Sequence, residues 1–363
     1  MVLIARAPMR ISFGGGGTDL PAYYEQYGGM VVSTTINHYA YTILTPGKPD
    51  SLQVVSADYH TFYRRPPCED LVWDGDLALP KAVINHFNVQ NGVNIFLASQ
   101  IPPGTGLGSS GSVAVAMIKA LAFWCGLDLS PYEVAEMASF IEIEKMGMPV
   151  GKQDQYAAAF GGLNHIIFEK DGSVQVDAIN LPPDIMVAFQ KRMMLFFTGT
   201  SRKSSTILRH QKRGSEKGDQ LIVERLHAIK ELAMSIKQAL ERGDLDGFGE
   251  LLHLSWLNKR GLTENITNPF IDKCYTAARA AGAIGGKITG AGGGGFMMLC
   301  CPPERQADVT RVLEGLGLRR LDFAFDHEGA QVMWAVSGTT PYARWNAMLS
   351  QTMLQKQEQE QTV

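Results

Sequence analysis

Cysteine is scarce in this 363-residue sequence, which contains five: Cys68, Cys125, Cys274, Cys300 and Cys301. Their number is odd and no two are spaced as Cys-x-x-Cys, so the sequence predicts neither a disulfide framework nor a structural zinc site. We therefore expect reduced thiols, which are typical of cytoplasmic proteins.

Strong net charge and long apolar segments are also missing. The net charge of −3 predicts no basic surface for nucleic acid or an anionic membrane. The apolar run at residues 1–5 is too short for a signal peptide. The longest apolar helical stretch, residues 113–127, contains Lys119 and is shorter than a membrane span. We expect a cytoplasmic protein whose partners include neither nucleic acid nor a membrane.

Glycine, by contrast, is abundant, with 38 residues, and clusters of it form three loops. The loops are residues 10–19 (RISFGGGGTD), 102–111 (PPGTGLGSSG) and 287–296 (KITGAGGGGF). Clustered glycine indicates backbone that must approach a ligand closely. The pattern GxxxxGK[ST] does not occur in the sequence, which excludes a P-loop kinase.

The second loop has the features of a phosphate-binding loop. It follows a predicted strand and opens a predicted helix over residues 109–124. Its glycines would let backbone N–H groups close around phosphate oxygens, and the helix dipole would favour the negative charge. Ser109 and Ser110 stand where their hydroxyls can reach a phosphate or its metal ion. The predicted phosphate-binding residues are Pro103, Gly104, Gly106, Gly108, Ser109, Ser110 and Gly111.

Residues 106–111 and 290–295 also fit GxGxxG, the dinucleotide-binding fingerprint, so a nicotinamide-dependent oxidoreductase is a competing hypothesis. That fingerprint requires an acidic residue at the end of a second strand about 20 residues later. The candidate, Asp128, lies between two predicted helices. A strand-like run, and not a helix, follows the third loop.

The hydrophobic pattern predicts two domains, residues 1–190 and 191–340, followed by a polar tail at 341–363. The first contains mostly strands before residue 101, and a capping box at residues 130–133 opens a helix. In the second, a buried strand at 193–197 leads into a charged loop that runs to Gly218. An apolar stripe then predicts a helix over residues 219–242.

Three such loops in this order and spacing resemble the GHMP kinases, and the resemblance covers about residues 4–300. It implies an α+β fold with an N-terminal domain like ribosomal protein S5 domain 2 and a ferredoxin-like C-terminal domain. The active site would lie in the cleft between them, with ATP and Mg²⁺ as cofactors. Within the family, residues 10–21 and 151–162 resemble bacterial kinases of D-glycero-D-manno-heptose 7-phosphate. Such enzymes make the 1,7-bisphosphate for nucleotide-activated heptose and surface polysaccharide.

The resemblance also assigns catalytic and metal-binding residues. Asp154 matches the family's catalytic base, and Arg10 matches the cation beside it, which would keep Asp154 ionised. Ser110 and Glu142 would bind the metal ion, since Mg²⁺ needs only one or two carboxylates beside phosphate and water. Glu144 is the alternative carboxylate, although it lies on another helix face and is expected to be solvated.

The acceptor would be bound by the first and third loops. Asp19 matches the family's sugar-binding aspartate and would accept hydrogen bonds from hydroxyl groups. The basic segment 198–205 precedes a helix predicted through Ile207 and Leu208. It either offers hydroxyls and cations for the acceptor's phosphate, or a serine there caps the helix and the cations are solvated. Lys287 is either a phosphate contact or a charge at a strand end. The remaining predicted acceptor-binding residues are Gly16, Gly17, Thr18, Ser201, Arg202, Gly292 and Gly293.

Two alternatives stay open within the family, and a third is disfavoured. The acceptor could be an unphosphorylated sugar such as galactose or fucose, or the protein could be a non-catalytic sugar sensor. The decarboxylase branch is disfavoured, because nothing indicates a diphosphate-bearing isoprenoid acid. A monomer and a homodimer are both compatible with the sequence.

Overall fold

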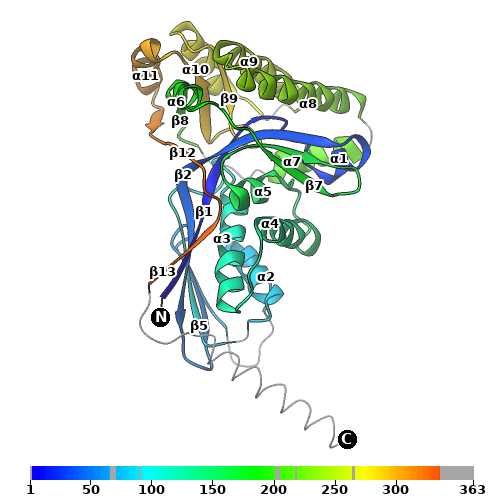
Figure 1. Cartoon of the computed structure of the whole chain (residues 1–363), viewed down its shortest axis with the longest axis vertical. Helices are drawn as coiled ribbons and strands as arrows, with labels where there is room; N and C mark the ends of the chain where they lie inside the picture. Colours follow the sequence, from blue (N-terminus) through cyan, green and yellow to red (C-terminus); the bar gives the residue numbers. More distant parts are fainter. Residues whose placement is uncertain are drawn as a thin grey trace, which may run out of the picture.

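The computed structural model describes residues 2–65, 71–89, 91–200, 205–216, 219–263 and 266–335. Two sheets organise this part of the chain (Figure 1). The larger has nine strands, with the path β13-β1-β2-β5-β3-β4, and β6, β7 and β12 join it through β2. Its strands are β1 (Val2–Gly14), β2 (Gly29–Pro46), β3 (Leu52–Ser56), β4 (Thr61–Arg64), β5 (Val93–Ser99), β6 (Leu163–Phe168), β7 (Val174–Ala178), β12 (Phe325–Asp326) and β13 (Gln331–Ala335).

The two longest strands, β1 and β2, pair antiparallel and carry the first glycine loop between them. The pairing register shifts between Pro8 and Met9, which fits the missing N–H of proline. β2 pairs with β6 over its first half and with β5 over its second half. The sequence runs 31–36 and 39–44, both rich in β-branched and aromatic residues, therefore lie in one strand.

Helices α2 (Ala78–His86), α3 (Ser109–Trp124), α4 (Pro131–Ser139) and α5 (Gln153–Phe160) lie on one side of this sheet (Figure 1). α3 is buried over most of its surface, because it is enclosed by the sheet and the other helices. The capping box that opens α4 is confirmed: Ser130 N donates to Glu133 Oε2 at 2.8 Å, and Ser130 Oγ accepts from Glu133 N at 3.3 Å. A π-helical turn, η2 (Phe140–Lys145), continues α4.

The second sheet has the antiparallel order β11-β8-β10-β9. In chain order this is 4-1-3-2, with helices before β9 and before β11, so the predicted ferredoxin-like arrangement is confirmed. The strands are β8 (Met193–Phe197), β9 (Gly285–Ile288), β10 (Phe296–Cys300) and β11 (Arg319–Leu321). The helices around them are α6 (Pro183–Arg192), α8 (Gln220–Glu241), α9 (Leu245–Arg260), α10 (Pro269–Ala280) and α11 (Gln306–Gly315).

The two sheets share an apolar core where β1 meets α6 and α9. The ring of Phe13 lies 5.4 Å from those of Phe189 and Phe248, measured between ring centroids. β12 and β13 follow the second sheet in sequence but pair with β2 and β1. The division at residue 190 stays a prediction, and the structure adds that the last described strands belong to the first sheet. The predicted tail lies outside the described residues.

One prediction for the second half is wrong. Residues 205–216 form a helix, α7 (Ser205–Glu216), so the charged loop predicted over them is wrong and the helix predicted through Ile207 and Leu208 is confirmed. Three positions spaced four residues apart, Ile207, Gln211 and Ser215, are buried. This stripe holds one apolar residue only, so the hydrophobic pattern does not reveal it. α6 and α9 were not predicted either.

Candidate active site

A cleft of about 630 Å³ lies where the three glycine loops meet. The second and third loops bring the two sheets together here, because Phe296 N donates to Thr105 O at 3.2 Å. The predicted site residues that line the cleft are Arg10, Gly16, Gly17, Asp19, Pro103, Gly104, Gly106, Gly108, Ser109, Ser110 and Asp154. Ser12, Gln153, Leu208, Gln211, Lys259, Lys287, Gly290 and Ala291 also line it.

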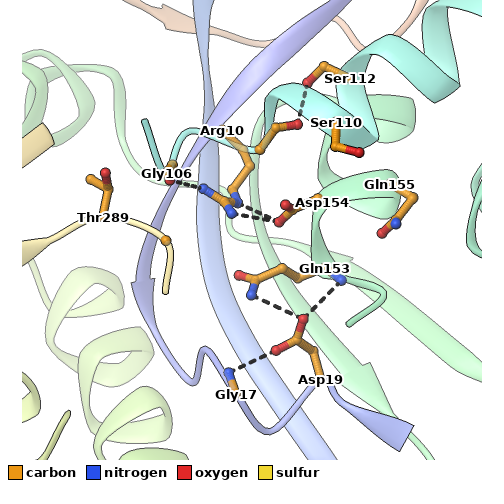
Figure 2. Close-up of polar contacts among 12 residues, drawn as sticks. Arg10, Gly17, Asp19, Gly106, Ser110, Ser112, Gln153, Asp154, Gln155 and Thr289 are labelled. Atoms are coloured by element: carbon orange, nitrogen blue, oxygen red, sulfur yellow. Dashed lines mark hydrogen bonds and ion pairs between the residues drawn. The ribbon is translucent and has the colours of Figure 1, made fainter. Parts of the chain in front are cut away.

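Arg10 and Asp154 form an ion pair at the centre of the cleft (Figure 2). Arg10 lies within β1, and its Nε and Nη2 are 2.8 and 2.7 Å from Asp154 Oδ1. Its Nη1 donates to Gly106 O at 2.7 Å, which ties the pair to the second loop. Gly111 faces Asp154 so closely that an added Cβ would lie 2.7 Å from the Cβ of Asp154. Only glycine fits at that point of α3 without displacing Asp154.

The second loop has the conformation that its glycines allow. Gly104, Gly106 and Gly108 have φ angles of 77°, 85° and 77°, in the left-handed region that favours glycine. α3 begins directly after Gly108, so free N–H groups of its first turn adjoin the cleft. The Ser109 hydroxyl is buried and has no hydrogen-bond partner among the described residues. The arrangement fits an anion at the start of α3.

Ser110, Glu142 and Gln155 form a buried polar group behind the loop. Ser110 Oγ donates to Glu142 Oε1 at 2.6 Å, and Gln155 Nε2 donates to Oε2 at 2.6 Å. Burial raises the pKa of Glu142 to about 7, although the two hydrogen bonds act in the opposite direction. Glu144, the alternative metal ligand, is exposed. The structure thus brings together the two residues predicted to bind a metal ion.

Asp19 connects the first loop to the start of α5 through hydrogen bonds (Figure 2). Its Oδ1 accepts from Gly17 N at 2.8 Å, and its Oδ2 accepts from Gln153 Nε2 at 3.0 Å and from Gln153 N at 3.3 Å. Burial, followed by the negative charge of Asp154, raises the pKa of Asp19. Asp19 therefore orders the loop as well as facing the cleft.

Three predicted acceptor-binding residues lie away from the cleft. Thr18 is fully buried, and its hydroxyl connects Gly15 O to Met30 N. Gly292 and Gly293 are buried against Ile266, whose carbonyl accepts from Gly293 N at 2.7 Å. For these three a structural role fits better, because their contacts are with neighbouring backbone. Ser201 and Arg202 lie outside the described residues.

Sequence reasoning left out several residues of the cleft. Lys259 lies at the end of α9, a helix that was not predicted, and its Nζ donates to Gly290 O. Gln153 precedes Asp154 directly, so its position was a signal that could have been used. Ser12 is buried, and its hydroxyl has no partner among the described residues.

The other end of the cleft is less polar. It is formed by the chain after β3, the start of α2, and β5. Asp58 Oδ1 accepts from Ser99 N at 3.0 Å, and burial raises the pKa of Asp58. Its apolar lining includes Leu77, Leu79, Pro80, Leu97, Ile101 and Val113. This end thus places an apolar lining beside the phosphate loop, as is common in pockets for small ligands.

Within the described residues, no helix is long and apolar enough to cross a membrane. The fold and the cleft define a two-lobed enzyme with a glycine-rich phosphate loop and an adjacent carboxylate–cation pair. Residues 78–162 match the family model of the GHMP kinases N terminal domain, and residues 236–316 match that of the GHMP kinases C terminal domain. D-glycero-alpha-D-manno-heptose 7-phosphate kinase of Campylobacter jejuni is 33% identical over 331 residues, which cover 90% of this chain and 97% of that protein. The chain belongs to the GHMP kinase family.

Solved structures agree. A protein from Bacteroides thetaiotaomicron, described as a D-glycero-D-manno-heptose 1-phosphate kinase, matches with a TM-score of 0.77 and 30% identity, over 93% of this chain and all of that one. Lactococcus lactis galactokinase has the same fold, with a TM-score of 0.73, 19% identity and coverage of 91% of this chain and 95% of that one.

As a GHMP kinase, the chain is a phosphotransferase that uses ATP as donor and an alcohol group as acceptor. The oxidoreductase hypothesis is wrong. Asp128 lies between α3 and α4, and β10 follows the third loop, so neither GxGxxG segment has the context of a dinucleotide fold.

Proposed function

We propose that this GHMP kinase phosphorylates the anomeric hydroxyl of D-glycero-D-manno-heptose 7-phosphate with ATP. The single observation that carries the proposal is the likeness to the Campylobacter jejuni kinase, which extends over nearly the whole of both chains. The product would be the 1,7-bisphosphate, a precursor of nucleotide-activated heptose for surface polysaccharide. We place the reaction in the cytoplasm.

In the proposed mechanism the anomeric oxygen attacks the γ-phosphorus of ATP. A new oxygen–phosphorus bond forms, the bond to the β-phosphate oxygen breaks, and ADP leaves. Asp154 accepts the proton of the hydroxyl, which becomes acidic as its bond to phosphorus forms. Arg10 holds Asp154 in place through their ion pair and would face the charge of the transferring group. The second loop and the first turn of α3 hold the donor phosphates.

Ser110 and Glu142 would hold a Mg²⁺ ion, which would neutralise phosphate charge during transfer. Their hydroxyl and carboxylate are oxygen ligands of the kind that Mg²⁺ prefers. In the described part of the chain, no three His, Cys, Asp or Glu side chains form a cluster able to hold a metal ion. The remaining ligands would therefore come from ATP and water.

The two heptose kinases similar to this chain differ in the phosphate position that their names give, 7 or 1. A release assay for ADP with heptose 7-phosphate, heptose 1-phosphate, unphosphorylated heptose and galactose tests the proposal. We expect kcat/KM to be highest for heptose 7-phosphate. Equal or higher values for galactose would favour a simple sugar kinase, and no ADP release with any sugar would favour a sensor.

A further inference from the structure

Two lysines from the lobe of the second sheet line the cleft. Lys259 stands at the end of α9 and Lys287 within β9, and their exposed fractions are 7% and 3%. Lys259 Nζ donates to Gly290 O, and Lys287 Nζ donates to Phe13 O at 2.9 Å. Neither lysine forms an ion pair with a carboxylate in the described residues.

Buried ammonium groups are costly unless an opposite charge compensates them. The two carboxylates near the lysines are already engaged. Asp154 is paired with Arg10, and Asp19 accepts hydrogen bonds from its own loop and from Gln153. Three cations thus face two carboxylates in this part of the cleft, so its positive charge is only partly compensated.

The charges show that these groups face a common space. Burial, followed by the cation of Arg10, lowers the pKa of Lys259 to about 8, and Asp19 acts in the opposite direction. Burial also lowers the pKa of Lys287, with Lys259 and Arg10 adding to the effect. An anion placed among the three cations would reverse this repulsion.

The position of the lysines indicates which anion belongs there. The donor phosphates have their own site on the first lobe, at the start of α3. Lys259 interacts with Asp19, the residue assigned to the acceptor, and Lys287 contacts Phe13 of the first loop. Both lysines thus contact or interact with residues of the first loop, which the proposed function assigns to the acceptor.

We propose that Lys259 and Lys287 bind the phosphate group of a phosphorylated sugar acceptor. The assignment rests on the proposed function, in which the acceptor carries a phosphate. It adds Lys259, which the sequence did not indicate, to Ser201 and Arg202, and it assigns Lys287, for which the sequence left two roles open. It also explains why the cleft would prefer a sugar phosphate over a neutral sugar, since only the sugar phosphate supplies negative charge to the two lysines.

The test compares Lys259→Met and Lys287→Met with a matched control, Lys119→Met. Lys119 is partly buried, and its Nζ also donates to one backbone carbonyl, Leu129 O at 3.0 Å, outside the cleft. We expect Lys259→Met to raise KM for heptose 7-phosphate by roughly ten- to a hundredfold. The KM for ATP and the kcat/KM for unphosphorylated heptose should stay within about twofold, and the control should match the wild type.

An equal loss with both sugars would overturn the proposal and assign the lysines to the transferring phosphoryl group. An unchanged KM for heptose 7-phosphate in both cleft variants would overturn it as well. If the wild type phosphorylates no sugar phosphate, the proposed function fails, and calorimetric titration with inorganic phosphate in the presence of a non-hydrolysable ATP analogue still tests the site. Binding to the wild type and not to Lys259→Met supports the site, whereas equal binding to the two, or none to the wild type, rejects it.

Discussion

Arg10 approaches one oxygen of Asp154 with two nitrogens, Nε at 2.8 Å and Nη2 at 2.7 Å, and both distances are to Oδ1. The second oxygen, Oδ2, has no hydrogen bond to a described residue. One oxygen thus holds the carboxylate in place, and in the proposed mechanism the other is left to take the acceptor's proton. The cation is itself fixed by its bond to Gly106 O at 2.7 Å.

Replacing Asp154 with Asn should abolish turnover and spare ATP binding. The change removes the proton acceptor and leaves the second loop, which holds the nucleotide, in place. We expect kcat to fall at least ~10²-fold, the usual effect of a general base, while the Kd for ATP changes little. ADP release and calorimetry measure the two quantities, and Asp128→Asn, on an exposed loop, is the control. Retention of more than about a tenth of wild-type kcat would rule out Asp154 as the base.

The metal assignment separates two glutamates that are two residues apart. Glu142→Gln should raise the Mg²⁺ concentration that gives half-maximal rate, because it removes the charged ligand beside Ser110. Glu144→Gln should leave it unchanged, since that side chain is exposed. A Mg²⁺ titration at saturating ATP gives both values, and the reverse pattern would transfer the role to Glu144.

Adding one methyl group at Gly111 should impair the enzyme. The new Cβ would lie 2.7 Å from the Cβ of Asp154, so α3 and α5 must move apart or Asp154 must shift. Overpacking of this kind costs roughly 1–3 kcal/mol of unfolding free energy. Kinetics and thermal unfolding of Gly111→Ala should show reduced kcat and a lower Tm.

The matched control is Gly315→Ala in α11, where an added Cβ meets nothing within 4 Å. There the exchange should be neutral or stabilise the protein by up to about 1 kcal/mol, because alanine has the higher helix propensity. If both variants had the same kcat and Tm, the close contact between Gly111 and Asp154 would not matter for activity or stability.

Binding of the acceptor should weaken at alkaline pH. The lowered pKa of Lys259, about 8, means that its ammonium form dominates below that pH and is lost above it. The charged groups around it are Arg10, Asp19 and Lys287, and the two cations oppose its protonation. The KM for heptose 7-phosphate should therefore rise above pH 8, and Lys259→Met should remove this rise. A profile of identical shape in wild type and variant would contradict the role of Lys259.

The sequence predicted the parts of the site that are local in the chain. Each of these parts, namely the second loop, its helix and the Asp154 segment, occupies a short stretch of sequence. Their glycines and serines indicate the backbone conformation directly. Contacts between distant segments could not be predicted in the same way. Lys259 reaches the cleft only because α9 packs beside β9, and no local pattern marks it.

The three predicted acceptor-binding residues that lie away from the cleft show the same limit. Thr18 lies between Gly17 and Asp19, which both line the cleft. Its own side chain is hydrogen-bonded to the carbonyl groups of Gly15 and Met30, the latter in β2. Glycines at 292 and 293 satisfy the motif, but the loop packs on Ile266 and leaves Gly290 and Ala291 at the cleft. Which glycines of such a run face a ligand depends on the segment that the loop packs against. The sequence of the run does not indicate that segment.

The pairing of β13 with β1 has a consequence for synthesis on the ribosome. The outer edge of β1, from Val2 to Arg6, pairs with residues 331–335, which are made last among the described strands. At roughly 5–20 residues per second, the nascent chain waits tens of seconds before this edge can be covered. An unpaired, largely apolar strand edge attracts other chains, so vectorial folding exposes this protein to aggregation late in translation. Slow release of the chain from the ribosome, or a chaperone bound to β1 during this time, would reduce aggregation and raise the yield of folded protein.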